Sequence, residues 1–255
     1  MQLQRVHLGL VPALLCAETC CGKSSTLCYR ALTLLDAAGT IHHVACMVFV
    51  KICGLTDPDL VGFAAREGAD WIGFNFASGS PRQVTPEAAA SLLMQAGRAV
   101  PVALLVDASD AEIDAVTAVG FPILQLHGAE TPERLADIKA RTGLEVWKAL
   151  GVSTRVHLDN ARAYTAADRL LIDARPPEGA TRTGGHGQTF DWAILDGWQA
   201  PKPWMLAGGL TPDNVSTAIA ATGAPAVDVA SGVERVRGLK DRELVRAFIR
   251  AAKEA

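Results

Sequence analysis

Phe49-Val50-Lys51-Ile52-Cys53-Gly54-Leu55-Thr56 is the stretch of sequence on which the predicted fold depends. Mostly apolar residues run into a cysteine and a glycine, and Thr56-Asp57-Pro58 then offers a helix start. A continuous apolar run of this length is typical of a parallel strand that is covered on both faces. Cys53 then stands at the carboxyl end of the strand, where α/β folds place their chemistry.

The same strand–helix unit repeats through the rest of the chain. Strands are predicted at residues 49–53, 71–76, 102–106, 123–127, 145–150, 169–173, 203–207 and 226–230. Helix starts recur between them at Thr85-Pro86-Glu87, Thr131-Pro132-Glu133 and Thr211-Pro212, where threonine can cap and proline fits the first turn. A last helix is predicted over residues 239–253. Eight such units predict a single closed (β/α)8 TIM barrel. An open doubly wound sheet is the alternative, but no G-x-G-x-x-G follows the first strand.

The composition favours a globular domain and argues against nucleic-acid-binding and membrane proteins. The 255 residues are 49% hydrophobic and 20% charged, which suits a domain with a sizeable core. The formal net charge is −3, so no basic surface for nucleic acid is expected. No apolar run reaches the roughly 18 residues of a membrane helix. We therefore expect neither nucleic acid nor a membrane as partner.

Residues 1–46 lack the repeating pattern and read as a non-conforming N-terminal extension. They hold five of the six cysteines: Cys16, Cys20, Cys21, Cys28 and Cys46. A signal peptide is one interpretation, but no clean cleavage site follows the short apolar run at 8–15. A metal site is a second, but the spacings match no paired C-x2-C pattern. The third, which we favour, is a mis-assigned start or a dispensable extension, with the barrel spanning residues 47–255.

The predicted barrel contains no cysteine after Cys53, so disulfides cannot hold it together. That distribution fits a reducing compartment, and a cytoplasmic location is expected.

Four side chains are predicted at the carboxyl ends of the strands, where a barrel collects its catalytic groups. They are Cys53, Arg82, His127 and Asp173. Each also has a plain structural interpretation. Cys53 could be a small buried apolar residue, and Asp173 a loop anchor. Arg82 could be a solvated charge, and His127 could bond only to a loop carbonyl.

Glycine clusters after the sixth, seventh and eighth strands favour a phosphate site. A phosphate is bound by backbone N–H groups at close range, which side chains would obstruct. The residues concerned are Gly185, Gly187, Gly208, Gly209, Ser231 and Gly232. Barrels commonly bind phosphate after their last two strands, so clusters on adjacent strands carry more weight than one alone.

Seven segments follow one another along the chain: KICGLT (51–56), SPR (80–82), LQLHG (124–128), LID (171–173), TFDW (189–192), AGGL (207–210) and DVASGVE (228–234). Together they resemble the phosphoribosylanthranilate isomerase family of tryptophan biosynthesis. The resemblance runs from about Met47 to the C-terminus, and residues 1–46 lie outside it. In the loop after the sixth strand the chain departs from the family, because His186 and Gln188 stand where the family often has a small residue and a lysine.

The resemblance implies an Amadori rearrangement of N-(5-phosphoribosyl)anthranilate, with Asp173 as general acid and Cys53 as general base. It implies that Arg82 pairs with the anthranilate carboxylate, as a guanidinium fork can, that His127 also contacts substrate, and that no metal or other cofactor is needed. A monomer and a homodimer both remain open.

Three other functions are alternatives for a barrel of this kind. The related isomerase of histidine biosynthesis uses aspartates at both positions, and Cys53 speaks against it. Indole-glycerol-phosphate synthase would need lysines where Cys53 and Arg82 stand. A catalytically inactive barrel that only binds a phosphorylated ligand is the alternative of a different class, and an assay of turnover separates it from an enzyme.

Overall fold

The computed structural model describes residues 33–35, 41–43, 47–175 and 189–255, which form two units. The first unit spans Met1–Met47 and the second Val48–Ala255. Within the first, β1 (Thr33–Leu35) pairs antiparallel with β2 (Ile41–His43).

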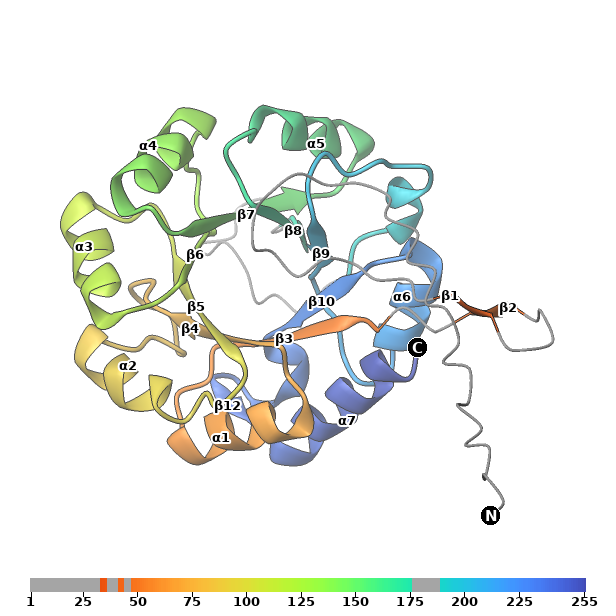
Figure 1. The fold of residues 1–255 in the computed structure, drawn as a ribbon, viewed down its shortest axis with the longest axis horizontal. Coiled ribbons are helices and arrows are strands. Elements are labelled where there is room, and N and C mark those ends of the chain that lie inside the picture. The colour runs from red at the N-terminus through yellow and green to blue at the C-terminus, as the bar shows by residue number, and fades with distance from the viewer. Residues whose placement is uncertain (1–32, 36–40, 44–46, 176–188) are drawn as a thin grey trace, which may run out of the picture. The chain divides into compact units, whose positions relative to one another are not determined.

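The second unit contains a closed eight-stranded parallel barrel, which confirms the predicted fold. Neighbouring strands pair in chain order, and β10 closes the ring by pairing with β3 (Figure 1). The strands are β3 (Phe49–Cys53), β4 (Trp71–Asn75), β5 (Val100–Leu105), β6 (Ile123–Leu126), β7 (Glu145–Val152), β8 (Arg169–Ala174), β9 (Trp204–Leu206) and β10 (Ala226–Val229).

Helices surround the barrel (Figure 1). They are α1 (Pro58–Glu67), α2 (Pro86–Leu93), α3 (Asp110–Val119), α4 (Pro132–Thr142), α5 (Arg155–Asp159), α6 (Val215–Thr222) and α7 (Arg242–Lys253), with 3-10 turns at Asn160–Ala163, Trp192–Leu195 and Ser231–Val233. The Thr-Pro-Glu starts behave as predicted: Thr85 and Thr131 each accept a bond from the backbone N–H three residues on, at 3.2 Å.

Two helix starts were predicted wrongly. Helix α6 begins at Val215 rather than at Pro212, because the side chain of Asn214 binds the N–H of Thr211 and the carbonyl of Gly209 and holds this segment as a loop. The last helix begins at Arg242 rather than at Leu239. A two-stranded ribbon of β11 (Glu234–Val236) and β12 (Leu239–Lys240) precedes it.

The two ends of the barrel interior differ in composition. The amino ends of the strands are filled by an aromatic cluster in which Trp71 packs edge-on against Trp147, with ring centroids 5.3 Å apart. The guanidinium of Arg169 lies over both rings. Further along the strands, buried Lys51, Gln125 and Asp228 take the place of apolar residues. Polar groups therefore gather toward the carboxyl ends, here called the barrel mouth.

Candidate active site

Cys53 is the last residue of β3 and lies between buried charges. It is 4% exposed. Lys51, two residues earlier on the same strand, points to the same side, and its Nζ donates to Asp228 Oδ1 on β10 at 2.8 Å. The charge of Lys51 acts on the Cys53 sulfur. The charge of Lys240, on β12, acts on the sulfur as well.

These neighbours act on the pKa of Cys53 in opposite directions. Burial raises the pKa of the thiol, Lys51 and Lys240 lower it, and Asp228 raises it, so that the pKa is raised overall. Burial also lowers the pKa of Lys51, but the charges of Asp228 and Cys53 outweigh this and raise it. Lys51 is thus held as a cation beside the sulfur.

Asp173 lies near the end of β8 and contacts His127. His127 Nε2 is 3.1 Å from Asp173 Oδ2, and His127 Nδ1 is 3.2 Å from the side-chain nitrogen of Gln125. The other oxygen, Asp173 Oδ1, accepts the N–H of Ala174 at 2.8 Å. The structure therefore joins two of the predicted site residues, His127 and Asp173, in one hydrogen-bonded chain that begins at Gln125.

Arg82, in the loop after β4, is buried rather than solvated. Its Nε and Nη2 donate to the two carboxylate oxygens of Glu234, at 2.5 and 2.7 Å. Glu234 also accepts from Lys240 Nζ at 3.0 Å and from the N–H of Gly238. Burial raises the pKa of Glu234, but these bonds outweigh it and lower the pKa to about 2. The Glu234 carboxylate therefore holds two of the three guanidinium nitrogens of Arg82, Nε and Nη2.

The glycines after β9 and β10 lie in loops that touch. A Cβ on Gly232 would fall 1.8 Å from the carbonyl oxygen of Leu210, so the two backbones need a residue without a side chain there. Gly208 has a φ of +87°, and a Cβ on it would meet Ala174 N at 2.5 Å. Gly209 shares this loop, and Ser231 opens the 3-10 turn after β10. Gly185 and Gly187, together with His186 and Gln188, lie outside the described residues.

Sequence reasoning gave no role to Lys51, Gln125, Asp228, Glu234 or Lys240. The strand period of two offered one signal, because it places Lys51 on the side of Cys53 and Gln125 on the side of His127. Nothing local marks Glu234 as the partner of Arg82, since 152 residues separate them.

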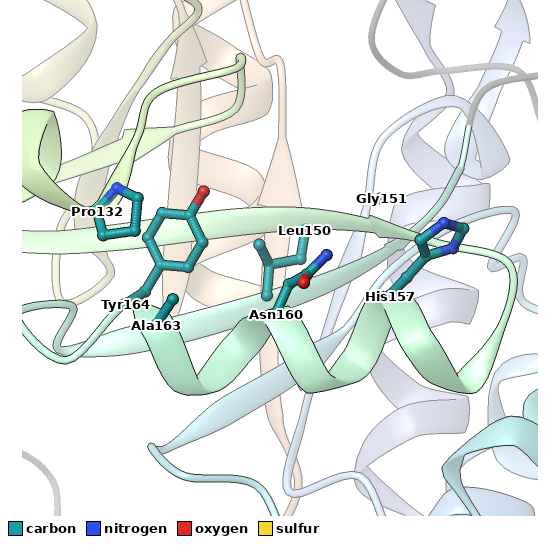
Figure 2. Close-up of a pocket in the computed structure, with 7 residues that line it drawn as sticks. All are labelled: Pro132, Leu150, Gly151, His157, Asn160, Ala163 and Tyr164. Atoms are coloured by element: carbon teal, nitrogen blue, oxygen red, sulfur yellow. The ribbon is translucent and has the colours of Figure 1, made fainter.

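A pocket of about 290 Å³ lies between β7, the start of α4, and α5 with the 3-10 turn that follows it, and none of the predicted site residues lines it (Figure 2). Its lining is Pro132, Leu150, Gly151, His157, Asn160, Ala163 and Tyr164. The Tyr164 hydroxyl donates to the carbonyl of Glu130, and His157 Nδ1 accepts the N–H of Ser153. Two of its polar side chains are thus bonded to the protein itself.

Among the described residues, no cluster of three or more His, Cys, Asp or Glu is placed to hold a metal ion. None of the helices in the same part of the chain has the length and apolar character that a membrane span requires. The cysteines at 16, 20, 21, 28 and 46 lie outside that part.

Comparison with known proteins gives a consistent match. Residues 50–251 match the family model of N-(5'-phosphoribosyl)anthranilate isomerase. The isomerase of that name from Hyphomonas neptunium is 69% identical over 207 residues, which cover 81% of this chain and 98% of the relative. The one from Rhodospirillum rubrum is 52% identical over 212 residues, which cover 80% and 97%.

Solved structures agree. The phosphoribosyl anthranilate isomerase of Thermotoga maritima superimposes with a TM-score of 0.72 at 35% identity, covering 82% of this chain and all of that one. A second structure, the isomerase in complex with reduced 1-(o-carboxyphenylamino)-1-deoxyribulose 5-phosphate, gives 0.69 at 33% identity over the same shares.

Proposed function

The chain belongs to the N-(5'-phosphoribosyl)anthranilate isomerase family, and we propose that Cys53 and Asp173 perform the acid–base chemistry of its reaction. The enzyme isomerises N-(5-phosphoribosyl)anthranilate to 1-(2-carboxyphenylamino)-1-deoxyribulose 5-phosphate, a step of tryptophan biosynthesis. The observation that carries the proposal is that a thiol with a cation beside it and a carboxyl group paired with histidine lie at the ends of strands of one barrel.

The reaction needs an acid first and a base second. Protonation of the ring oxygen of the ribose opens the furanose and leaves an iminium ion at C1. Removal of the C2 proton then converts the iminium into an enolamine, which tautomerises to the ketose. In our assignment Asp173 supplies the first proton and the Cys53 thiolate removes the second.

Gln125 and His127 suit the proposed role of Asp173 by holding its side chain in place. The side-chain nitrogen of Gln125 lies 3.2 Å from His127 Nδ1 and donates to it when His127 carries its proton on Nε2. Nε2 is the atom that lies 3.1 Å from Asp173 Oδ2. The Gln125–His127 pair thus orients the carboxyl group to which we assign the first proton transfer.

We propose the remaining contacts from the family resemblance and, where the structure describes the residue, from its position. Arg82 Nη1, which makes no bond to another described residue, faces the anthranilate carboxylate while Glu234 holds the rest of the fork. The loops at Gly208-Gly209 and Ser231-Gly232 bind the phosphate, together with Gly185 and Gly187. We place the enzyme in the cytoplasm as a monomer or homodimer. A Thermotoga maritima relative is described as dimeric, with monomers generated from it.

Substitution of the two catalytic groups tests the assignment. Cys53→Ala and Asp173→Asn should each lower kcat by at least about 10²-fold, because each removes one proton transfer. Turnover is followed by the loss of anthranilate-type fluorescence, and folding by circular dichroism. Asp114→Asn, at an exposed carboxylate of α3, is the matched control and should keep full activity. Near-native kcat in a folded Cys53→Ala or Asp173→Asn protein would refute the role of that residue.

A further inference from the structure

A fully buried lysine beside the proposed base has no role in the mechanism described so far. Lys51 is 0% exposed and lies inside the barrel, where an unpaired ammonium is strongly unfavourable. Its strand continues directly to Cys53, with one residue between them. A side chain used only to fill the core would be apolar at this position, as Ile52 and Val50 are on the other side of the strand.

The two strands that neighbour β3 determine where the Lys51 ammonium lies. Asp228 on β10 stands opposite Lys51 in the register that closes the barrel, and accepts its hydrogen bond at 2.8 Å. Gly73 on β4 provides the space that both groups occupy, because a Cβ there would lie 2.8 Å from the sulfur of Cys53 and 3.0 Å from Lys51 Nζ. The sulfur and the ammonium therefore share the space beside one glycine.

We propose that Lys51 is a positioning residue for Cys53, held by Asp228 so that its ammonium stabilises the thiolate. The inference rests on the proposed function of Cys53 as base. When the thiolate takes the C2 proton, the electron pair of the C2–H bond forms the C1=C2 bond and the iminium π electrons return to nitrogen. Lys51 keeps its own proton throughout, because its ammonium stays paired with Asp228.

The charged groups around the sulfur give the expected direction. Among the described residues these are Lys51 on its own strand, Asp228 on β10 and Lys240 on β12. Removing the Lys51 cation leaves burial and Asp228 opposed only by Lys240. Burial and Asp228, which both disfavour the thiolate, are stronger than Lys240. In a protein without Lys51, Cys53 should therefore titrate at higher pH.

Lys51→Met is the test, with two readouts. The first is the ultraviolet absorbance of the Cys53 thiolate against pH, taken as the difference from a Cys53→Ser protein so that the other five thiols cancel. The second is the acid limb of kcat/KM against pH, which reports the free enzyme. Both should move up by about one pH unit or more, and each unit lowers kcat/KM on that limb about tenfold.

Two further variants serve as a control and as an alternative to Lys51→Met. Lys148→Met removes another buried lysine, paired with Glu130 near β7, and should leave the titration of Cys53 unchanged. If Lys51→Met does not fold because Asp228 is left unpaired, Lys51→Met with Asp228→Asn removes both charges. The titration should then move up by less, because Asp228 itself disfavours the thiolate.

The outcomes are distinct. A Cys53 titration that coincides with wild type in folded Lys51→Met, or in the double variant if that alone folds, overturns the inference. A titration that moves while the acid limb of kcat/KM stays in place keeps the Lys51–Cys53 coupling but refutes Cys53 as the base. Movement of both readouts supports the two proposals together.

Discussion

Buried ion pairs are concentrated toward the barrel mouth. Lys51 pairs with Asp228, Lys148 with Glu130, and Lys240 with Glu234, which also binds Arg82. Removing a charge from water costs several kcal/mol, which the partner offsets only when the geometry is good. Such pairs are therefore weak evidence for stability. Two of the three lie beside proposed site residues: Lys51–Asp228 beside Cys53, and Lys240–Glu234 beside Arg82.

Glu234 provides a prediction at the scale of one residue. Its pKa is lowered from 4.5 to about 2 in the folded protein. A lowered carboxyl pKa stabilises the fold fully above pH 4.5, and this contribution is lost as the pH falls toward 2. Glu234→Gln should therefore be less stable than wild type at neutral pH, and the difference should shrink between pH 4.5 and pH 2.

Denaturant unfolding at a series of pH values measures that difference. Glu243→Gln, at a glutamate of α7 whose side chain is 72% exposed, serves as the control and should differ little from wild type at any pH. A Glu234→Gln deficit that stays constant down to pH 2 would mean that its ion pairs are not what lowers the pKa.

The loop after β6 is held by contacts within the protein. After β6, Glu130 accepts the N–H groups of Asp107 and Gly128 and is paired with Lys148. Asp107, with φ of +47°, in turn accepts the N–H of Ala129 at 2.6 Å. These bonds hold Gly128 and Ala129, the two residues that follow His127. The loop that carries His127 is thus held on both sides before substrate arrives.

Gly232 provides a prediction at the scale of the element. Its missing side chain lets the turn after β10 approach the loop after β9, where a Cβ would lie 1.8 Å from a backbone oxygen. Gly232→Ala must separate the two loops, which costs about 1–3 kcal/mol as overpacking usually does. We expect a melting temperature lower by about 2–4 °C per kcal/mol and a raised KM, because the proposed phosphate site is built from both loops.

Gly143→Ala is the comparison for Gly232→Ala. Gly143 ends α4 with φ of +67°, and no atom lies within 4 Å of a Cβ built there. That variant should cost about 1–2 kcal/mol of backbone strain and leave KM unchanged. If Gly232→Ala also keeps its KM, the loop after β10 does not belong to the phosphate site.

At the scale of the whole molecule, the question is whether residues 1–46 contribute to the barrel. The family match begins at residue 50, and the Hyphomonas neptunium relative is covered almost completely by 207 aligned residues. Strand β3 begins at Phe49 and finds both of its neighbours, β4 and β10, within residues 47–255. The barrel thus closes with segments that follow Met47.

We predict that a protein starting at Met47 folds with the melting temperature and kcat/KM of the full chain. A segment that packed on the core would lose about 25 cal/mol for each Å² of apolar surface exposed by its removal. The truncated protein should also cross-link less under oxidation, since it lacks five of six thiols. Insolubility, or melting many degrees lower, would show that residues 1–46 are part of the fold.

The barrel was predictable because its signals are local. Apolar runs such as 49–53 and caps such as Thr85 and Thr131 act within a few residues, and they predicted the strands and most helix starts. The errors fell where local signals were overridden. Thr211-Pro212 reads as a helix start, but the Asn214 side chain binds both sides of it and delays the helix to Val215.

By itself, the sequence determined the order of the strands, the position of Cys53 and Asp173 at strand ends, and the family. Only the tertiary structure decided which side chains meet there. Lys51 and Asp228 are 177 residues apart, and Arg82 and Glu234 are 152 apart. These pairs form because β10 closes the ring against β3 and brings the ribbon after it to Arg82. Propensity and periodicity act over a few residues, whereas the contacts of a buried charge depend on the closed barrel.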